Sequence, residues 1–365
     1  MERADRLRTA ARFSLSGVLT SAPMRRALVA LLLVTGLVVV WLLRPYSPPR
    51  AAVPRPARGY DDAVARIARL VARDSIGLAS GCGTSARLHG HRTARAIVLL
   101  HGITNCPLQF AGVAESLAAG GDNVLVPRVN HHGLRDRMGA DLANLTAEEL
   151  SELAAECVAI AHGLGDTVVV AGLSTSAVAA AWAAERVPGV DRAVLIAPAF
   201  APAFLKPPVP RVVSSWLTRL ALRVPNRFVW WDQKKQRALP GPTQCYYGFS
   251  TRALAQAYRL GEAIRRARPE PGVHDVAWVL TDADEAVDNT RSIALAGAWR
   301  RDVPDLRQRI VRFPTAGHVL HDMVDPAQVG ARPDVVWPVL IAAIRGQNLP
   351  AGTPARETTP SASAR

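Results

Sequence analysis

The stretch TVVVAGLSTSAVAAAWAA, residues 167–184, limits what this chain can fold into more than any other segment. Residues 167–171 are typical of a buried strand, and the alanine-rich run after Ser176 is typical of a helix. A strand that passes into a helix through so short a turn needs small residues on both sides, and Gly172 and Ser176 provide them. The pattern predicts that Ser174 lies on a sharp turn and exposes its hydroxyl at the carboxyl end of the strand.

Strand-like and helix-like segments alternate on both sides of this stretch. Helix patterns cover residues 107–121 and the run that begins at Thr146, where Glu149 completes a capping signature. The alternation predicts an α/β fold with a mostly parallel sheet and helices on both faces. The further predicted strands are residues 96–100, 123–127, 192–198, 275–281 and 307–313.

Residues 199–265 interrupt the alternation because they contain no continuous apolar strand. A segment of this length between two strands of an α/β sheet predicts an inserted cap. Its aromatic side chains are candidates to line an apolar pocket, although we expect about half of them only to pack the cap onto the body. These side chains are Trp216, Phe228, Trp230, Trp231, Tyr246, Tyr247 and Phe249.

The N-terminal region carries an uncharged apolar run, residues 27–43, behind a basic tail, residues 1–26. As a helix this run would be about 26 Å long, close to the thickness of a bilayer core. Six arginines precede the run and four follow it, a weak bias that favours a cytoplasmic N-terminus. We expect a single-pass membrane anchor with an extracytoplasmic domain. The alternative is a signal peptide whose cleavage releases a secreted protein.

The other boundaries follow from composition. Residues 44–75 are interpreted as a linker and lead-in, residues 76–345 as the α/β domain, and residues 346–365 as a polar, proline-rich tail without fixed structure. The net charge of +14 is carried almost entirely by arginine, and the first 58 residues hold ten arginines against two acidic residues. Because most of the excess flanks the apolar run, we expect a membrane contact and no nucleic-acid partner.

The four cysteines show no metal-binding spacing. Cys157 lies in a helix-like run with apolar neighbours and is expected to be a buried thiol. If the domain is exported, Cys82 could form a disulfide with either Cys106 or Cys245.

A serine at such a turn becomes a nucleophile only beside a base, and the base needs an acid that orients it. In folds of this class the order along the chain is serine, acid, histidine. His318 comes just after the strand 307–313 and is the predicted base. His321 lies one helical turn further on and is the weaker candidate, while His274 precedes its strand and lies at the wrong end.

The acid is expected after the strand 275–281, where the sequence is DADEAVD. Asp284 is the predicted acid, with Asp282 and Asp288 as alternatives. Carboxylates at such positions also cap turns and helices, which is the competing interpretation.

The segment LLHGITNCP, residues 99–107, follows the first apolar strand. The N–H of Ile103 is a candidate donor to a negatively charged oxygen, and the N–H of Thr175 at the start of the helix is the second. Such donors matter because they bind charge that exists only in the transition state. The histidines His101, His131 and His132 are expected to be structural.

Five pieces of the chain carry a family resemblance: VLLHGITNCPLQF, NVLVPRVNHHG, VVVAGLSTS, VLTDADEAVDN and FPTAGHVLHD, in this order between about residues 95 and 322. The chain resembles α/β-hydrolases of the esterase and lipase type, such as bacterial carboxylesterases and monoacylglycerol lipases. The resemblance implies an α/β-hydrolase fold with a cap. It also implies the following roles: nucleophile Ser174, orienting acid Asp284, general base His318, and oxyanion donors Ile103 and Thr175.

Two positions depart from that family pattern. Ser176 replaces the family's glycine after the nucleophile, and NHHG at residues 130–133 stands where many relatives have a Gly-His-Gly turn. Neither change removes a group that the chemistry needs.

Together these features predict a serine hydrolase that cleaves small-molecule carboxylic esters through an acyl-enzyme. Two alternatives stay open. The first is a membrane-anchored binding protein that keeps the fold without turnover, and the second is an amide or thioester hydrolase, or an acyltransferase, with the same triad. No phosphate-binding loop, dinucleotide motif or metal spacing is present in the sequence, so we expect no cofactor.

Overall fold

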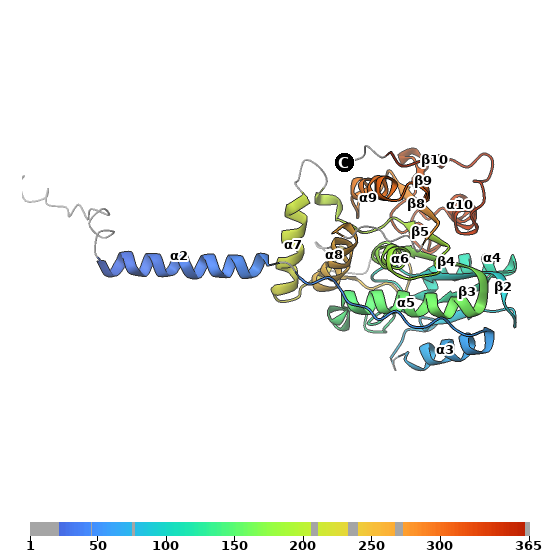
Figure 1. The fold of residues 1–365 in the computed structure, drawn as a ribbon, viewed down its shortest axis with the longest axis horizontal. Helices are drawn as coiled ribbons and strands as arrows, with labels where there is room; N and C mark the ends of the chain where they lie inside the picture. The colour runs from blue at the N-terminus through green and yellow to red at the C-terminus, as the bar shows by residue number, and fades with distance from the viewer. Residues whose placement is uncertain are drawn as a thin grey trace, which may run out of the picture. The chain divides into compact units, whose positions relative to one another are not determined.

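A central sheet of eight strands organises the chain, with the spatial order β1-β3-β2-β4-β5-β8-β9-β10 (Figure 1). The six inner strands are parallel, and an antiparallel strand closes each edge. The strands are β1 (Ser85–Arg87), β2 (Thr93–Leu100), β3 (Asn123–Val126), β4 (Gly165–Leu173), β5 (Arg192–Ile196), β8 (Asp275–Thr281), β9 (Arg307–Phe313) and β10 (Arg356–Thr358). The predicted parallel sheet is confirmed, because all six strands expected from the sequence belong to it.

This computed structural model describes residues 22–44, 46–74, 77–205, 211–232, 240–266 and 273–361. The chain divides into two units, Met1–Pro45 and Tyr46–Arg365. The sheet and its helices all belong to the second unit. The described part of the first unit is the helix α2 (Ala22–Leu43) and the residue after it.

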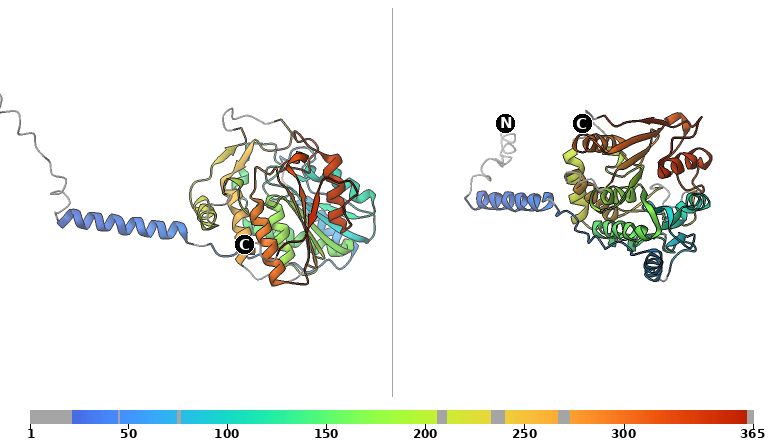
Figure 2. Two further views of the ribbon diagram at one scale, coloured as in Figure 1. Left: turned by 90° about the horizontal axis from the view of Figure 1, so that it is seen from above. Right: turned by 45° about the vertical axis from the view of Figure 1, so that its right-hand side comes forward.

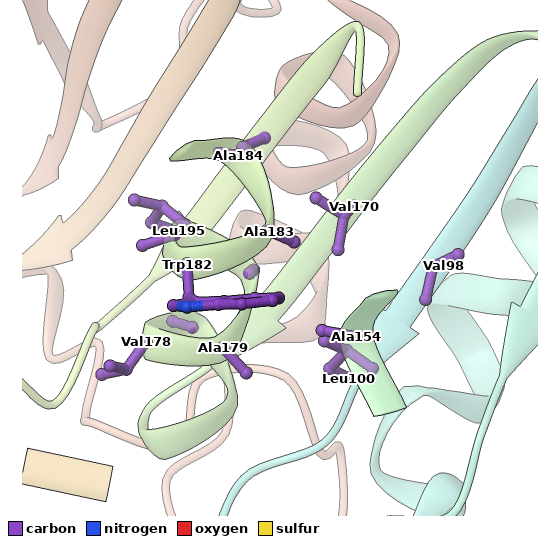
Figure 3. Close-up of a cluster of buried hydrophobic side chains, with 14 of the residues drawn as sticks. Val98, Leu100, Ala154, Val170, Val178, Ala179, Trp182, Ala183, Ala184 and Leu195 are labelled. Carbon is purple, nitrogen blue, oxygen red and sulfur yellow. The ribbon is translucent and has the colours of Figure 1, made fainter. Parts of the chain in front are cut away.

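Helices cover both faces of the sheet (Figure 2). One face packs against α5 (Ala147–Leu164), α6 (Thr175–Arg186) and α9 (Asn289–Asp302), and the other packs against α4 (Ala111–Ala119) and α10 (Pro333–Arg345). Side chains alternate along each strand, so that Val98 enters the first core while Leu99 enters the second. Figure 3 shows part of the first core, which contains Trp182 of α6 together with Val98 of β2, Val170 of β4 and Leu195 of β5.

The helix α5 begins as its sequence predicts. The side chain of Thr146 accepts a hydrogen bond from the backbone of Glu149, and the carboxylate of Glu149 accepts one from the backbone of Thr146. This reciprocal capping box satisfies two amide groups that a helix start would otherwise leave without partners.

The described residues of the cap region form two helices and a small hairpin. Its elements are a short 3-10 turn (Ala203–Leu205), α7 (Arg211–Arg223), the antiparallel strands β6 (Phe228–Trp230) and β7 (Gly248–Ser250), and α8 (Thr251–Arg266). The helix α8 packs against α6, and α7 packs against α8 (Figure 1). The cap therefore lies beside the helix that starts directly after Ser174.

Two segments differ from the sequence interpretation. Within the predicted linker and lead-in, Tyr60–Ala72 form a helix, α3, which buries Ala63, Ile67 and Leu70 against the body. Within the expected structureless tail, Arg356–Thr358 form β10 and pair with β9. Each segment is stabilised by contacts with residues distant in sequence, and composition alone does not predict such contacts. Residues 362–365 lie outside the described residues.

The helix α2 is long and apolar enough to cross a membrane. It has 22 residues, none of them buried, and spans about 33 Å at the usual rise per residue. A membrane anchor and a signal sequence both satisfy these criteria, so the structure shows a candidate for either.

If α2 is an anchor, the full-length chain should stay in the membrane pellet after an alkaline carbonate wash, because burial of the apolar helix in the bilayer does not depend on peripheral contacts. Immunoblotting of the pellet and the supernatant, with N-terminal sequencing of the protein, makes the measurement. A mature N-terminus between residues 45 and 60 would show cleavage and exclude the anchor.

Candidate active site

The turn between β4 and α6 places Ser174 in an unusual backbone conformation. Its φ is 59° and its ψ is −118°, a region that residues with a side chain rarely adopt. The backbone N–H of Ser174 donates to Ile196 O at 2.9 Å, and the N–H of Ala199 donates to Ser174 O at 3.1 Å. Hydrogen bonds to β5 and to the segment that follows it thus hold the turn on both sides of Ser174.

The residues around the turn explain why the sequence needs small side chains there. A Cβ atom at Gly172 would lie 2.3 Å from the carbonyl oxygen of Ser176, so only glycine fits. Ser176 itself is buried at the first turn of α6. A hydroxymethyl group is accommodated at this position, where the family resemblance expects glycine.

A histidine joins Ser174 to a buried carboxylate, and this histidine is His321. Its Nε2 lies 3.0 Å from Ser174 Oγ, and its Nδ1 lies 2.9 Å from Asp284 Oδ2. Because an ionised carboxylate only accepts hydrogen bonds, Nδ1 carries the proton facing Asp284. In the neutral ring Nε2 is then free to accept the proton of the Ser174 hydroxyl.

The choice of His318 as the base is wrong, because the structure does not bring His318 to Ser174. After β9 the chain makes a short 3-10 turn, Thr315–Gly317, and His318 follows it in the left-handed conformation with an exposed side chain. Val319 then returns to the core, and its carbonyl accepts a hydrogen bond from Thr281. His321 is therefore the histidine that reaches the turn at Ser174.

The structure separates the three candidate acids by their contacts. One oxygen of Asp284 accepts hydrogen bonds from the N–H groups of Ala286 and Val287, while its other oxygen faces His321. Asp282 forms an ion pair with Arg312 at 3.0 Å. Asp288 caps the helix α9. Of the three acids, only Asp284 lies against His321.

Burial and charge shift the titration of the pair. Burial alone would raise the pKa of Asp284, but the adjacent His321 and the two backbone donors outweigh it and hold the pKa below its usual value. For His321, burial opposes the charged ring, yet the charge and hydrogen bond of Asp284, with a smaller effect of Asp322, raise the pKa above its usual 6.5. The His321 side chain is 22% exposed, so solvent reaches the site.

The buried side chain of His101 fixes the first peptide of the loop after β2. The N–H of Val129 donates to His101 Nε2, so the other ring nitrogen carries the proton and donates to Gly102 O at 3.0 Å. In a planar trans peptide the C=O and the next N–H point in opposite directions, so the Ile103 N–H points away from His101. Burial keeps the pKa of His101 well below its usual value, which maintains the neutral ring.

Each of the two predicted oxyanion donors lies close to Ser174, one in the cavity lining and the other in the chain. Ile103 and Ser174 line the same cavity, and Thr175 begins α6 directly after Ser174. Among the described residues, neither the Ile103 N–H nor the Thr175 N–H donates to another group. The loop is tied further by Gln109, which accepts from the N–H of Gly102 and donates to Asp322 next to His321.

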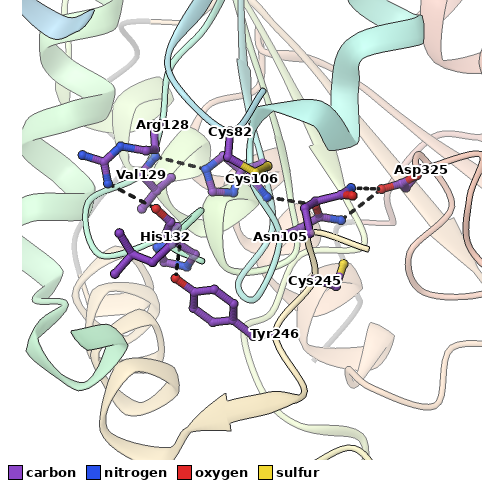
Figure 4. Close-up of a disulfide and its surroundings, with 12 residues drawn as sticks. Cys82, Asn105, Cys106, Arg128, Val129, His132, Cys245, Tyr246 and Asp325 are labelled. Carbon is purple, nitrogen blue, oxygen red and sulfur yellow. Dashed lines mark hydrogen bonds between the residues drawn. A yellow bond between two sulfur atoms is a disulfide. The ribbon is translucent and has the colours of Figure 1, made fainter. Parts of the chain in front are cut away.

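A disulfide joins Cys82 to Cys106 at the end of this loop (Figure 4). Next to it, the side chain of Asn105 accepts from the N–H of Cys106 and donates to Asp325. The sequence left two partners open for Cys82, and the structure selects Cys106. Cys245 is a free thiol, and the prediction that Cys157 is a buried free thiol is confirmed.

The other two histidines of the expected structural set also make structural contacts. His132 is buried, stacks on Tyr246 and meets His101 edge-on. His131 has a positive φ of 66°, and its ring lies between Asp141 and Glu149. Both side chains brace the loop after β3 without reaching Ser174.

A cavity of about 410 Å³ opens above Ser174 and His321, and its lining is mostly apolar. A second cavity, of about 490 Å³, lies between α7 and α8. The two cavities share lining side chains, namely Pro202, Phe204, Trp231, Phe249, Leu254 and Tyr258.

The cap aromatics divide between lining and packing. Trp231, Tyr246, Tyr247 and Phe249 line the first cavity, and Trp230 lines the second. Phe228 packs edge-on against Trp230, and Trp216 is exposed on α7. In the part of the chain that the structure describes, no cluster of His, Cys, Asp or Glu side chains could hold a metal ion.

The sheet, the helices on its two faces and the serine at the turn after β4 define an α/β-hydrolase. A sequence model of the serine aminopeptidase S33 family, Hydrolase_4, matches residues 91–323, and the chain belongs to this family of serine hydrolases. No curated protein matches the chain in sequence.

Solved structures that are similar to this chain include lipolytic enzymes. A structure from the study of the metagenome-derived lipolytic enzymes LipS and LipT is 18% identical, with a TM-score of 0.55, covering 74% of this chain and 100% of that one. The monoacylglycerol lipase of Paleococcus ferrophilus is 18% identical, with a TM-score of 0.49, covering 67% and 91% of the two chains. The monoglyceride lipase of Saccharomyces cerevisiae, in a soluble variant, is 14% identical, with a TM-score of 0.45, covering 66% and 88%.

Proposed function

We propose that the chain hydrolyses carboxylic esters through an acyl-enzyme on Ser174. The observation that carries the proposal is a chain of two hydrogen bonds. It joins Asp284 to His321 at 2.9 Å and His321 to Ser174 Oγ at 3.0 Å, in the lining of an apolar cavity. A serine, a base and an orienting acid within hydrogen-bond distance are the groups that nucleophilic acyl transfer requires.

In the first step, Ser174 Oγ attacks the carbonyl carbon of the ester while His321 Nε2 takes the hydroxyl proton. The carbonyl oxygen becomes negatively charged and is bound by the N–H groups of Ile103 and Thr175, each worth about 3–4 kcal/mol in such sites. The intermediate collapses, the C–O bond to the alcohol breaks, and the alcohol leaves with the proton from His321. Water then attacks the acyl-enzyme by the same route and releases the acid.

Asp284 acts by holding His321 in the tautomer and orientation that the first step needs. Its charge also stabilises the imidazolium that forms when His321 accepts the proton. The two backbone donors on its other oxygen, from Ala286 and Val287, fix the carboxylate in place.

The cavity lining favours an ester with an apolar acyl group. Apolar and aromatic side chains such as Leu173, Trp231 and Phe249 form most of the surface near Ser174. A second candidate function is that of an aminopeptidase, the activity that the family description names. It is favoured by two carboxylates, Glu285 and Asp322, that line the same cavity and could bind a substrate ammonium group.

We further propose that α2 anchors the chain in a membrane with the hydrolase domain on the extracytoplasmic side. The disulfide between Cys82 and Cys106 supports this side, because structural disulfides persist in oxidising compartments and are rare in the cytosol. The arginines around the apolar run favour the same orientation.

Two histidines three positions apart give a matched test of the site. His321→Ala should lower kcat for a soluble p-nitrophenyl ester by about 10⁴- to 10⁶-fold, because it removes the base. Ser174→Ala should fall in the same range, and the double variant should be hardly slower than either single one. His318→Ala should stay close to the wild type.

Folding of each variant is checked by circular dichroism. If His318→Ala is slow and His321→Ala is active, the base is His318, and the assignment to His321 is wrong. Wild-type turnover of alanine p-nitroanilide, with none of the ester, would favour the aminopeptidase.

The acid side of the pH profile should report His321. Since only the neutral ring accepts the serine proton, kcat/KM should rise with pH through an apparent pKa above 6.5. The charge of Asp322 contributes to that raised pKa, so Asp322→Asn should move the rise to lower pH. Glu285→Gln, which changes another carboxylate at the cavity, should leave it in place. If the apparent pKa of this rise in kcat/KM is unchanged or higher in Asp322→Asn, the result contradicts this assignment.

A further inference from the structure

The cap helix α7 turns its apolar side outward. Val212, Trp216, Leu220 and Val224, the last directly after the end of α7, recur every fourth residue, and with Leu217 they are 36–48% exposed. On the opposite side of the helix, the polar side chains of Ser214 and Thr218 are buried and face inward. A helix on the surface of a water-soluble domain has the reverse pattern. We call the five exposed side chains the apolar side of α7.

Arginines accompany this apolar side. Arg219 and Arg223 lie on the helix beside it, and the exposed Arg227 follows its end. An amphipathic helix with large apolar side chains on one side and arginines next to them is typical of helices that lie in the headgroup region of a bilayer. The charge fits a surface that contains anionic lipids.

The residues that follow α2 along the chain contact the cap helices. The ring of Tyr46 lies under the guanidinium of Arg223 at 4.3 Å, and Arg259 of α8 donates to the carbonyl of Ser47 at 3.0 Å. Tyr46 comes three residues after Leu43, the last residue of α2. Three residues span at most about 11 Å. In a chain anchored by α2, the end of α7 therefore cannot lie far from the membrane surface.

The second cavity lies directly beneath α7. Leu217 belongs to the apolar side of α7 and also lines this cavity, and the 77% exposed Phe204 lines both cavities. Trp231 and Phe249 are common to the two linings, so apolar surface continues from α7 to the cavity at Ser174.

We propose that the apolar side of α7 docks into the bilayer that holds α2, and that the cavity beneath it receives acyl chains of membrane-resident esters. The docking rests on the exposed helix and the short connection to α2. The acyl-chain part rests on the proposed function.

The test of docking uses the full-length chain, one molecule per lipid nanodisc of phosphatidylcholine and phosphatidylglycerol. Leu220→Cys, in a Cys245→Ser background, carries an environment-sensitive NBD label. Val71→Cys on α3, where the native side chain is 47% exposed, is the matched control. The label at position 220 should shift to shorter wavelength and lose intensity when the lipids carry nitroxide groups. The label at position 71 should do neither.

A label at position 220 that behaves as in water overturns the docking. A shift that occurs only in vesicles holding many copies, without quenching by the lipids, also overturns it, because a second copy of the chain then covers α7.

Activity tests the acyl-chain part separately. Trp216→Gln with Leu220→Gln should slow hydrolysis of a long-chain ester embedded in the bilayer by about tenfold, equivalent to about 1.4 kcal/mol. The same variant should leave hydrolysis of a soluble short-chain ester unchanged. Equal rates on both substrates overturn the acyl-chain part. A wild type that hydrolyses neither ester refutes the proposed function, while the label still decides the docking.

Discussion

The positive φ of Ser174 is the constraint on which the rest of the site depends. A residue with a side chain in this region costs about 1–3 kcal/mol and persists only where its surroundings hold it. Here β5 and the segment after it provide the support, through the contacts of Ile196 and Ala199 with the backbone of Ser174. The absence of a side chain at Gly172 lets α6 start close to β4, so the serine hydroxyl stands at the carboxyl edge of the sheet.

The parallel sheet then determines where the partners of Ser174 can come from. The strands β4, β5, β8 and β9 are neighbours in this order, and their carboxyl ends meet at one edge. Ser174 follows β4, Asp284 follows β8, and His321 follows β9. The start of α6 adds positive potential at the same edge, which would favour the anionic intermediate of the proposed acyl transfer. Residues far apart in sequence converge because each follows the end of a parallel strand.

Much of this arrangement could be predicted from the sequence. Apolar runs and the capping box at Thr146 identified the strands and α5, and the small residues around Ser174 identified the turn. The sequence favours the histidine nearest the end of β9, but a 3-10 turn leaves His318 exposed, and the chain reaches Ser174 only three residues later, at His321. That local geometry has no periodic pattern. The same applies to β10, whose pairing depends on β9, and to Trp216, whose exposure depends on how α7 packs.

Covalent labelling with a fluorophosphonate, followed by peptide mass spectrometry, tests the central claim most directly. The account predicts a single adduct on Ser174 in the wild type, and a much slower reaction in His321→Ala because the serine has lost its base. An adduct on a different serine, or labelling of Ser174 that proceeds equally fast without His321, would contradict it.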